Sequence, residues 1–298
     1  MGIGASLTRG FDLAVEALRE TIEFHKQKFT DYIKYYLAAF AAGAGGAIGM
    51  LIPLVALFYL IYTSSLSGTA LLVAGAALGA LALALAVLGY VLATSSIFAS
   101  IRFVATGKKE RYFQGEDYMP ALKYILFYAV AIILIYAVLL GVPFLFILLP
   151  LLTASSQAGT AAASAAVAGM FAGIILFYTG IFIAIIAFYA FIFFYIYGVY
   201  EIAEKRIGPL DALKRSYALV KNNFWETLLF FIVMMVVAEV LQTLLSIVIV
   251  PFFLLAAISF VFWVAVVLVA IAVSIIATAA LGPAYVFFWD KIRKTQGA

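Results

Sequence analysis

The chain has 298 residues, of which 67% are hydrophobic and only 11% are charged, and it contains no cysteine. Soluble domains carry about 25% charged residues, so this composition excludes a soluble globular protein and indicates an integral membrane protein. The absence of cysteine excludes disulfide scaffolds, thiolate metal sites and cysteine nucleophiles.

The distribution of charge predicts the topology. All 18 Lys and Arg residues lie in four short segments, which are separated by three nearly uncharged stretches at residues 35–101, 124–200 and 227–289. A helix needs about 20 apolar residues to cross a bilayer, so each stretch can cross twice and turn. Two crossings return the chain to its starting side, which places every basic segment on one face. The positive-inside rule assigns that face to the cytoplasm.

The sequence therefore predicts an all-α, polytopic membrane bundle in the cell membrane. Its six transmembrane helices would form three hairpins, with cytoplasmic amphipathic helices at the N-terminus and between the hairpins. Both termini would lie in the cytoplasm.

Residues 1–34 form the first predicted element, an amphipathic helix at the cytoplasmic membrane surface or packed under the bundle. Apolar residues recur at helical spacing, with charged residues between them: Phe11, Ala14, Leu18, Ile22 and Phe29. The charges also interrupt any signal-peptide core. His25, the only histidine, belongs to this helix and is expected to be a solvated or interfacial side chain.

The six-span transmembrane domain covers residues 35–298. We place the spans at about 36–62, 70–103, 122–152, 165–200, 224–250 and 252–288. The first two outer turns contain serine, threonine and glycine, but the third, near Pro251, has only Ser246 and Ser259 as polar neighbours. The sequence leaves open whether this last hairpin spans fully, because a turn inside the bilayer needs protein around its freed backbone groups.

Three Gly-x-x-x-Gly pairs mark candidate helix-packing faces on spans one, two and four, because small residues let helix backbones approach closely. The pairs are Gly45 with Gly49, Gly75 with Gly79, and Gly169 with Gly173. A chain with 22 glycines also produces such pairs by chance.

Glu239 is the only carboxylate inside the three long stretches. An ionised carboxylate within a span costs about 2.5–3.5 kcal/mol on insertion scales, so it needs a functional or partnered role. Gln242, Thr243 and Ser246 follow at helical spacing and share its face. We interpret this intramembrane polar stripe as a contact between helices, within one protomer or between protomers. The alternative is a proton- or cation-responsive site.

No catalytic, cofactor-binding or metal-binding residue is predicted. A Ser-His-Asp arrangement needs a base beside its nucleophile, whereas His25 lies outside the spans. All the aspartates lie in the charged segments, so they cannot form the facing carboxylates of an intramembrane protease. No phosphate-binding Gly-Lys-Ser/Thr motif occurs. We therefore expect a protein that is not an enzyme.

Residues 208–225 read GPLDALKRSYALVKNNFW. This segment resembles the elbow helix before the fifth span in a broad superfamily of six-span integral membrane proteins. That superfamily includes the membrane domain fused to some glycerophosphodiester phosphodiesterases. The shared pattern is Gly, then Ala-Leu, Ser, Leu and Lys before an aromatic residue that enters the bilayer. The resemblance implies a membrane module; the phosphodiesterase domain has no counterpart in this sequence, so its activity is not carried over.

The elbow helix has a plain physical reading. Leu210, Leu213, Tyr217 and Val220 form an apolar stripe for the bundle or the interface, while basic side chains reach lipid headgroups. The elbow residues of interest are Pro209, Leu213, Lys214, Arg215, Ser216, Tyr217 and Lys221.

The expected partners are membrane lipids, through their anionic headgroups at the cytoplasmic face, and a second copy of the chain or another membrane protein. Each basic residue near such a surface contributes about 1 kcal/mol. A nucleic-acid surface is disfavoured because acids interleave with the basic residues. Our first hypothesis is a lipid-interacting or partner-organising module that self-associates. The alternative is a channel, transporter or translocation-pore subunit whose polar stripe lines an aqueous path.

Overall fold

The computed structural model describes residues 2–63, 68–141, 144–145, 148, 160–256 and 260–296. Within these ranges the chain is helical and contains no β-strand, which confirms the all-α class. Six of the described helices are long and apolar enough to cross a membrane. These helices are compatible with a multi-pass membrane protein, which the composition predicted.

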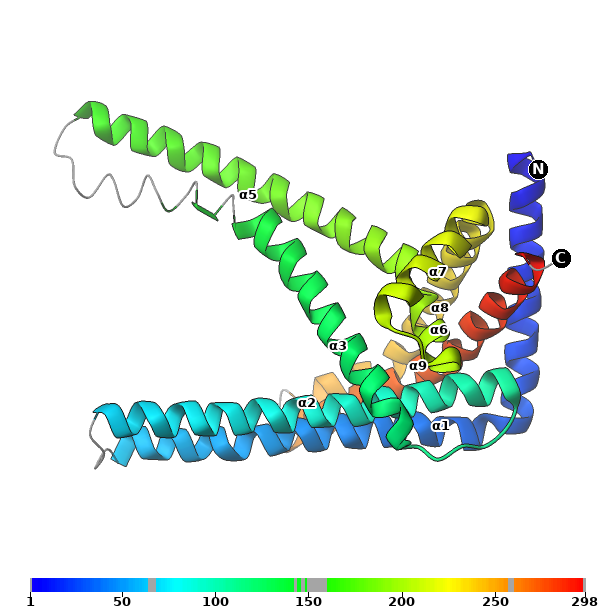
Figure 1. Cartoon of the computed structure of the whole chain (residues 1–298), viewed down its shortest axis with the longest axis horizontal. Coiled ribbons are helices and arrows are strands. Elements are labelled where there is room, and N and C mark those ends of the chain that lie inside the picture. Colours follow the sequence, from blue (N-terminus) through cyan, green and yellow to red (C-terminus); the bar gives the residue numbers. More distant parts are fainter. Residues whose placement is uncertain are drawn as a thin grey trace. The chain divides into compact units, whose positions relative to one another are not determined.

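The chain divides into two compact units, residues 1–122 with 197–298, and residues 123–196. The first unit holds the beginning of α3 (Gly115–Tyr136) and six further helices, labelled in Figure 1. These are α1 (Ile3–Thr63), α2 (Gly68–Thr106), α6 (Gly198–Lys205), α7 (Pro209–Asn222), α8 (Phe224–Ala256) and α9 (Phe260–Gln296). The second unit holds the rest of α3, the π-helical turn η1 (Ala137–Gly141) and α5 (Thr160–Tyr195). Aromatic rings join its two helices: Tyr124 of α3 stacks on Tyr195 of α5, with ring centroids 6.3 Å apart.

α1 is one uninterrupted helix. The sequence predicted an amphipathic helix up to residue 34 and a separate first span, but no proline or glycine lies near Lys34 to end the helix. The polar N-terminal part and the apolar part are therefore continuous. Figure 1 shows α1 changing direction between its N-terminal part and the part that runs beside α2.

α1 and α2 make the closest backbone contact among the described glycines. A Cβ atom on Gly46 would lie 2.6 Å from the Cα of Gly89, so the two helices cross at a point where neither has a side chain. Further along, Ser96 donates a 2.7 Å hydrogen bond to the carbonyl of Tyr35. Small residues thus set how closely α1 and α2 pack.

α8 runs through Pro251 to Ala256, and α9 begins at Phe260. The predicted end of the fifth span at residue 250 is therefore not a helix end, and the turn after it lies outside the described residues. Proline removes one helical hydrogen bond, but helices inside a membrane tolerate this loss when the freed group is satisfied nearby. The other two predicted outer turns, near residues 64–67 and 153–159, also lie outside the described residues.

Candidate functional site

Ion pairs connect the four charged segments of the sequence into a closed ring within the first unit. Neighbouring segments are joined by Asp31–Lys109, Asp117–Arg206, Glu204–Arg293, and Lys291 with Glu16 and Glu20. The four segments therefore lie at one end of this unit, which we call the charged end. That these segments share one face of a membrane, and that this face is cytoplasmic, stays a prediction.

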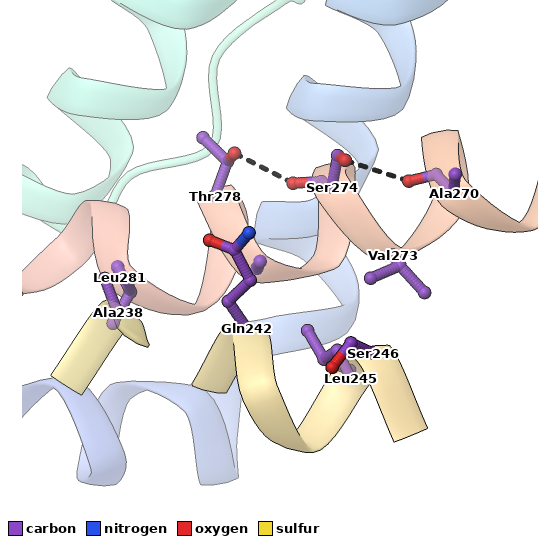
Figure 2. Close-up of a pocket in the computed structure, with 10 residues that line it drawn as sticks. Ala238, Gln242, Leu245, Ser246, Ala270, Val273, Ser274, Thr278 and Leu281 are labelled. Carbon is purple, nitrogen blue, oxygen red and sulfur yellow. Dashed lines mark hydrogen bonds between the residues drawn. The ribbon is translucent and has the colours of Figure 1, made fainter. Parts of the chain in front are cut away.

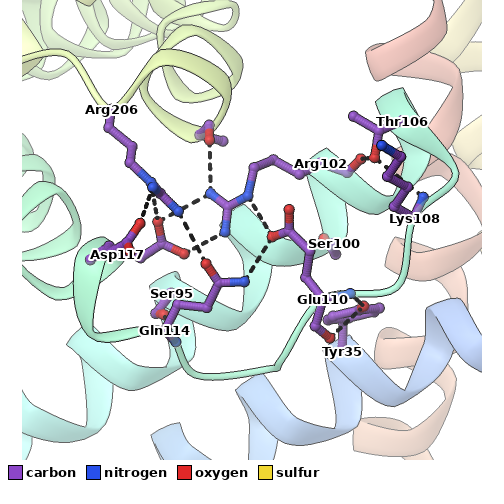
Figure 3. A network of polar contacts seen from close by, with 12 residues as sticks. Tyr35, Ser95, Ser100, Arg102, Thr106, Lys108, Glu110, Gln114, Asp117 and Arg206 are labelled. Carbon is purple, nitrogen blue, oxygen red and sulfur yellow. Dashed lines mark hydrogen bonds and ion pairs between the residues drawn. The ribbon is translucent and has the colours of Figure 1, made fainter.

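Arg102 and Asp117 form the centre of the charged end, shown in Figure 3. Nη1 and Nη2 of Arg102 donate to the two carboxylate oxygens of Asp117 at 3.1 and 2.5 Å. Nε of Arg102 donates to Glu110 at 2.6 Å, and Nη1 also donates to the carbonyl of Ala203 at 2.8 Å. Asp117 is fully buried. A buried ion pair needs such additional hydrogen bonds to offset the cost of leaving water.

Arg206 extends this network to the end of α6. Its guanidinium donates to Asp117 at 3.2 Å and to Gln114 at 3.1 Å, and it also pairs with Glu116. Gln114 in turn donates to Glu110 at 3.0 Å. Asp117 thus lies between two guanidinium groups. These contacts suit a structural role for Asp117, in which it holds α2, α3 and α6 together, better than a role as a general base.

Lys109 and Asp31 close the ring on the exposed side, with Nζ and the carboxylate 2.6 Å apart. The hydrogen bond that Lys109 donates to the Asp31 carboxylate raises the pKa of Lys109. The pair therefore stabilises the fold at neutral pH, and its contribution is lost as the pH rises through the raised pKa of Lys109. The same bond lowers the pKa of Asp31, so the contribution is also lost as the pH falls through that lowered pKa.

The predicted intramembrane polar stripe divides into two parts. Gln242 and Ser246 line a pocket of about 390 Å³ between α8 and α9, together with Ser274 and Thr278 of α9 (Figure 2). Glu239 and Thr243 are exposed and do not line it. The sequence analysis did not single out Ser274 and Thr278, although two hydroxyl residues four apart on an apolar helix were a usable signal.

The hydroxyl groups of the pocket already have partners on their own helices. Ser246 donates to the carbonyl of Thr243 at 2.7 Å, Ser274 to that of Ala270 and Thr278 to that of Ser274, both at 2.8 Å. Figure 2 shows the Gln242 amide pointing from α8 toward α9. This amide makes no hydrogen bond with any described residue, so its donors and its acceptor are available to a ligand, whereas the hydroxyl groups can only accept.

Glu239 has no ion pair or hydrogen bond with the described residues. It lies on α8 beside exposed apolar side chains, among them Val236 and Val240, which are 59% and 56% exposed. The structure therefore leaves a carboxyl group on the outer face of a membrane-length helix.

The elbow helix α7 packs on α6 and buries two small and two larger residues. The buried residues are Ala212, Ser216, Leu219 and Val220. The predicted apolar stripe is therefore split: Val220 is buried, Leu213 is half-buried, and Leu210 and Tyr217 are exposed. Pro209 opens the helix at its first turn, where its missing N–H costs nothing.

The glycine pairs differ in their surroundings. A Cβ atom at Gly45 or Gly79 would meet nothing within 4 Å, whereas one at Gly49 or Gly75 would make ordinary contact with a leucine side chain. Gly173 is buried, and the surroundings of Gly169 lie outside what the structure describes. Gly46, one residue from the predicted motif, makes the close contact.

His25 is half-buried, and its Nε2 lies 2.8 Å from the carbonyl of Ala280 in α9. This bond makes Nε2 the donor and ties α1 to α9. None of the described residues form a group of three or more His, Asp or Glu that could hold a metal ion.

A comparison of the chain with protein-family models, curated proteins and solved structures finds no match. The resemblance of residues 208–225 to the six-span superfamily therefore stays a prediction.

Proposed function

We propose that this protein is a non-enzymatic membrane module that interacts with lipid and self-associates through the outer face of α8, with its charged end in the cytoplasm. The observation that carries this proposal is Glu239. It is exposed on an apolar helix and has no partner among the described residues.

Energetics favour a helix as the partner of this face. A carboxyl group that faces lipid alone costs about 2.5–3.5 kcal/mol when ionised. Hydrogen bonds between membrane helices contribute about 0.6–2 kcal/mol each, so a second α8 that bonds Glu239 and Thr243 recovers part of that cost. Apolar neighbours such as Val236 add packing around the polar contact.

Four acids of the charged end support a non-enzymatic role. Asp31, Asp117, Glu201 and Asp290 all take part in ion pairs, and Asp117 is enclosed by guanidinium groups. Paired carboxylates of this kind hold helices together and are poorly suited to exchange protons with a substrate.

Cross-linking tests the proposed association, and the cysteine-free chain suits it. Val236→Cys on the Glu239 face is expected to form disulfide-linked dimers in membranes. Leu268→Cys, equally exposed but on α9, is the matched control. Adding Glu239→Leu is expected to reduce the Val236→Cys dimer several-fold, whereas Glu239→Gln keeps hydrogen bonding and preserves it. Equal cross-linking at both positions, or a protein that stays monomeric in native mass spectrometry from membranes, would contradict self-association through α8.

A second candidate function, solute passage or binding within the membrane, is favoured by the α8–α9 pocket. Its volume of about 390 Å³ lies within the range of small-molecule sites. The free Gln242 amide supplies a polar group that could orient a small uncharged polar solute.

A further inference from the structure

We propose that α7 docks on anionic phospholipid headgroups through one exposed face, made of Leu210, Lys214, Tyr217 and Lys221, which we call the α7 outer face. This inference rests on the lipid-interacting part of the proposed function and names both the surface and the lipid class.

Helical geometry places these four residues together. They are spaced four, three and four residues apart, so they follow one another along a single side of the helix. Leu210 is 60% and Tyr217 49% exposed, and both lysines are exposed. The buried residues of α7, such as Ala212 and Ser216, project from a different side.

The charge of the α7 outer face is exclusively positive. Lys214 and Lys221 have no ion pair with any described residue. The acid of this helix, Asp211, lies on another side, next to Arg215. Arg215 lies 3.7 Å from buried Glu201, so its charge is partly satisfied within the protein. An apolar residue, a tyrosine and two free lysines form the pattern of a helix that inserts shallowly and attracts anionic lipid.

The position of α7 along the chain supports the same assignment. The helix ends at Asn222, and α8, a membrane-length helix, begins at Phe224. Phe224 and Trp225 are 37% and 38% exposed at this junction. Aromatic residues at the end of a span mark the membrane–water boundary, so the preceding helix lies at the level of the headgroups.

The experiment compares lipid preference in charge-matched variants of the full-length protein. Each is reconstituted in phosphatidylcholine vesicles, and the association of spin-labelled phosphatidylglycerol is measured relative to spin-labelled phosphatidylcholine. Lys214→Gln with Lys221→Gln removes two charges from the α7 outer face. Lys108→Gln with Arg111→Gln removes two exposed charges that have no described ion pair from the α2–α3 connection. Lys214→Arg with Lys221→Arg tests whether charge alone is required.

We expect the first variant to lose about 25-fold in preference for phosphatidylglycerol, because each of the two lysines near an anionic surface contributes about a factor of five. The arginine variant is expected to retain the preference, and the α2–α3 variant to lose only a small part of it. An equal loss in both glutamine variants, or none in the first, would overturn the assignment to α7. If the unmodified protein shows no preference, the lipid-interacting part of the proposed function fails as well.

A second measurement distinguishes lipid from a protein partner. A fluorophore on Leu210→Cys is expected to be quenched by spin-labelled lipid in vesicles that contain only this protein, whereas one on Ala218→Cys, on another exposed side of α7, remains accessible to aqueous quenchers. Equal aqueous quenching at both positions would show that the α7 outer face does not meet the membrane.

Discussion

Arg102, near the end of α2, and Asp117, in the first turn of α3, bind each other through two hydrogen bonds at a buried site. The same arginine also bonds Glu110 in the connection between the two helices and the carbonyl of Ala203 in α6. One guanidinium therefore fixes the return of the chain after the first hairpin and its contact with α6.

Breaking this pair is expected to be costly. Asp117→Asn leaves the Arg102 charge buried with a weaker partner, and removing one member of a buried ion pair costs about 3–5 kcal/mol. Arg102→Met with Asp117→Leu is expected to cost less than the two single variants together, because the ion pair between these two residues is then lost only once. Unfolding midpoints in detergent measure this. Lys109→Gln, in the exposed pair with Asp31, serves as the control and should change little.

The crossing of α1 and α2 is expected to be intolerant of a single methyl group. Gly46→Ala places a Cβ atom 2.6 Å from the Cα of Gly89, a backbone atom that cannot rotate away. Overpacking of this kind costs about 1–3 kcal/mol. Gly45→Ala, one residue earlier, meets nothing within 4 Å and is expected to be neutral or to stabilise the helix by up to about 1 kcal/mol. Thermal unfolding that ranks the two variants alike would argue against the crossing.

The side chain of Arg206 makes stabilising hydrogen bonds, but its backbone adopts an unfavourable conformation. It follows α6 with φ of 54° and ψ of 31°, a left-handed conformation that costs a non-glycine residue about 1–2 kcal/mol. Arg206→Gly and Arg206→Ala both lose the bonds to Asp117 and Gln114, but only glycine relieves the backbone. We therefore expect the glycine variant to be more stable than the alanine variant by about 1 kcal/mol in equilibrium unfolding. The opposite order would mean that this backbone conformation is not adopted.

Filling the α8–α9 pocket tests the second candidate function. Ala277 lines the pocket, and Ala277→Leu occupies part of its volume without adding charge. If small polar solutes pass or bind there, uptake into proteoliposomes is expected to fall several-fold in Ala277→Leu and in Gln242→Leu. Glu239→Gln is expected to leave this uptake unchanged, because Glu239 does not line the pocket. If uptake depends on Glu239 but not on Ala277, the solute does not pass through this pocket.

Hydropathy and charge predicted the helical membrane class because length and composition alone decide whether a helix can cross a bilayer. Helix boundaries were harder to predict from the sequence. Nothing near Lys34 breaks the helix, so the change from polar to apolar sequence was mistaken for an end, and Pro251 lies within α8 although proline often marks a turn.

The candidate sites also include residues that the sequence revealed and contacts that it could not reveal. Glu239 and Gln242 were found because polar residues stand out in an apolar stretch. The contact between Arg102 and Asp117 depends on how α2 and α3 meet, and spacing alone does not contain this information. Gly45 fits the Gly-x-x-x-Gly pattern, but the face that α1 turns toward α2 is the one that carries Gly46.

Dissolved ions act unequally on the ring of ion pairs. Screening at physiological ionic strength extends over about 8 Å in water but penetrates poorly into buried sites. Glu16 and Lys109, which are 56% and 68% exposed, belong to pairs that concentrated electrolyte weakens, whereas the side chains of Arg102 and Asp117 are 8% and 0% exposed. High salt therefore weakens the ion pairs of Lys291 with Glu16 and Glu20, which join the C-terminal part of α9 to α1. The buried pair between α2 and α3 keeps its geometry.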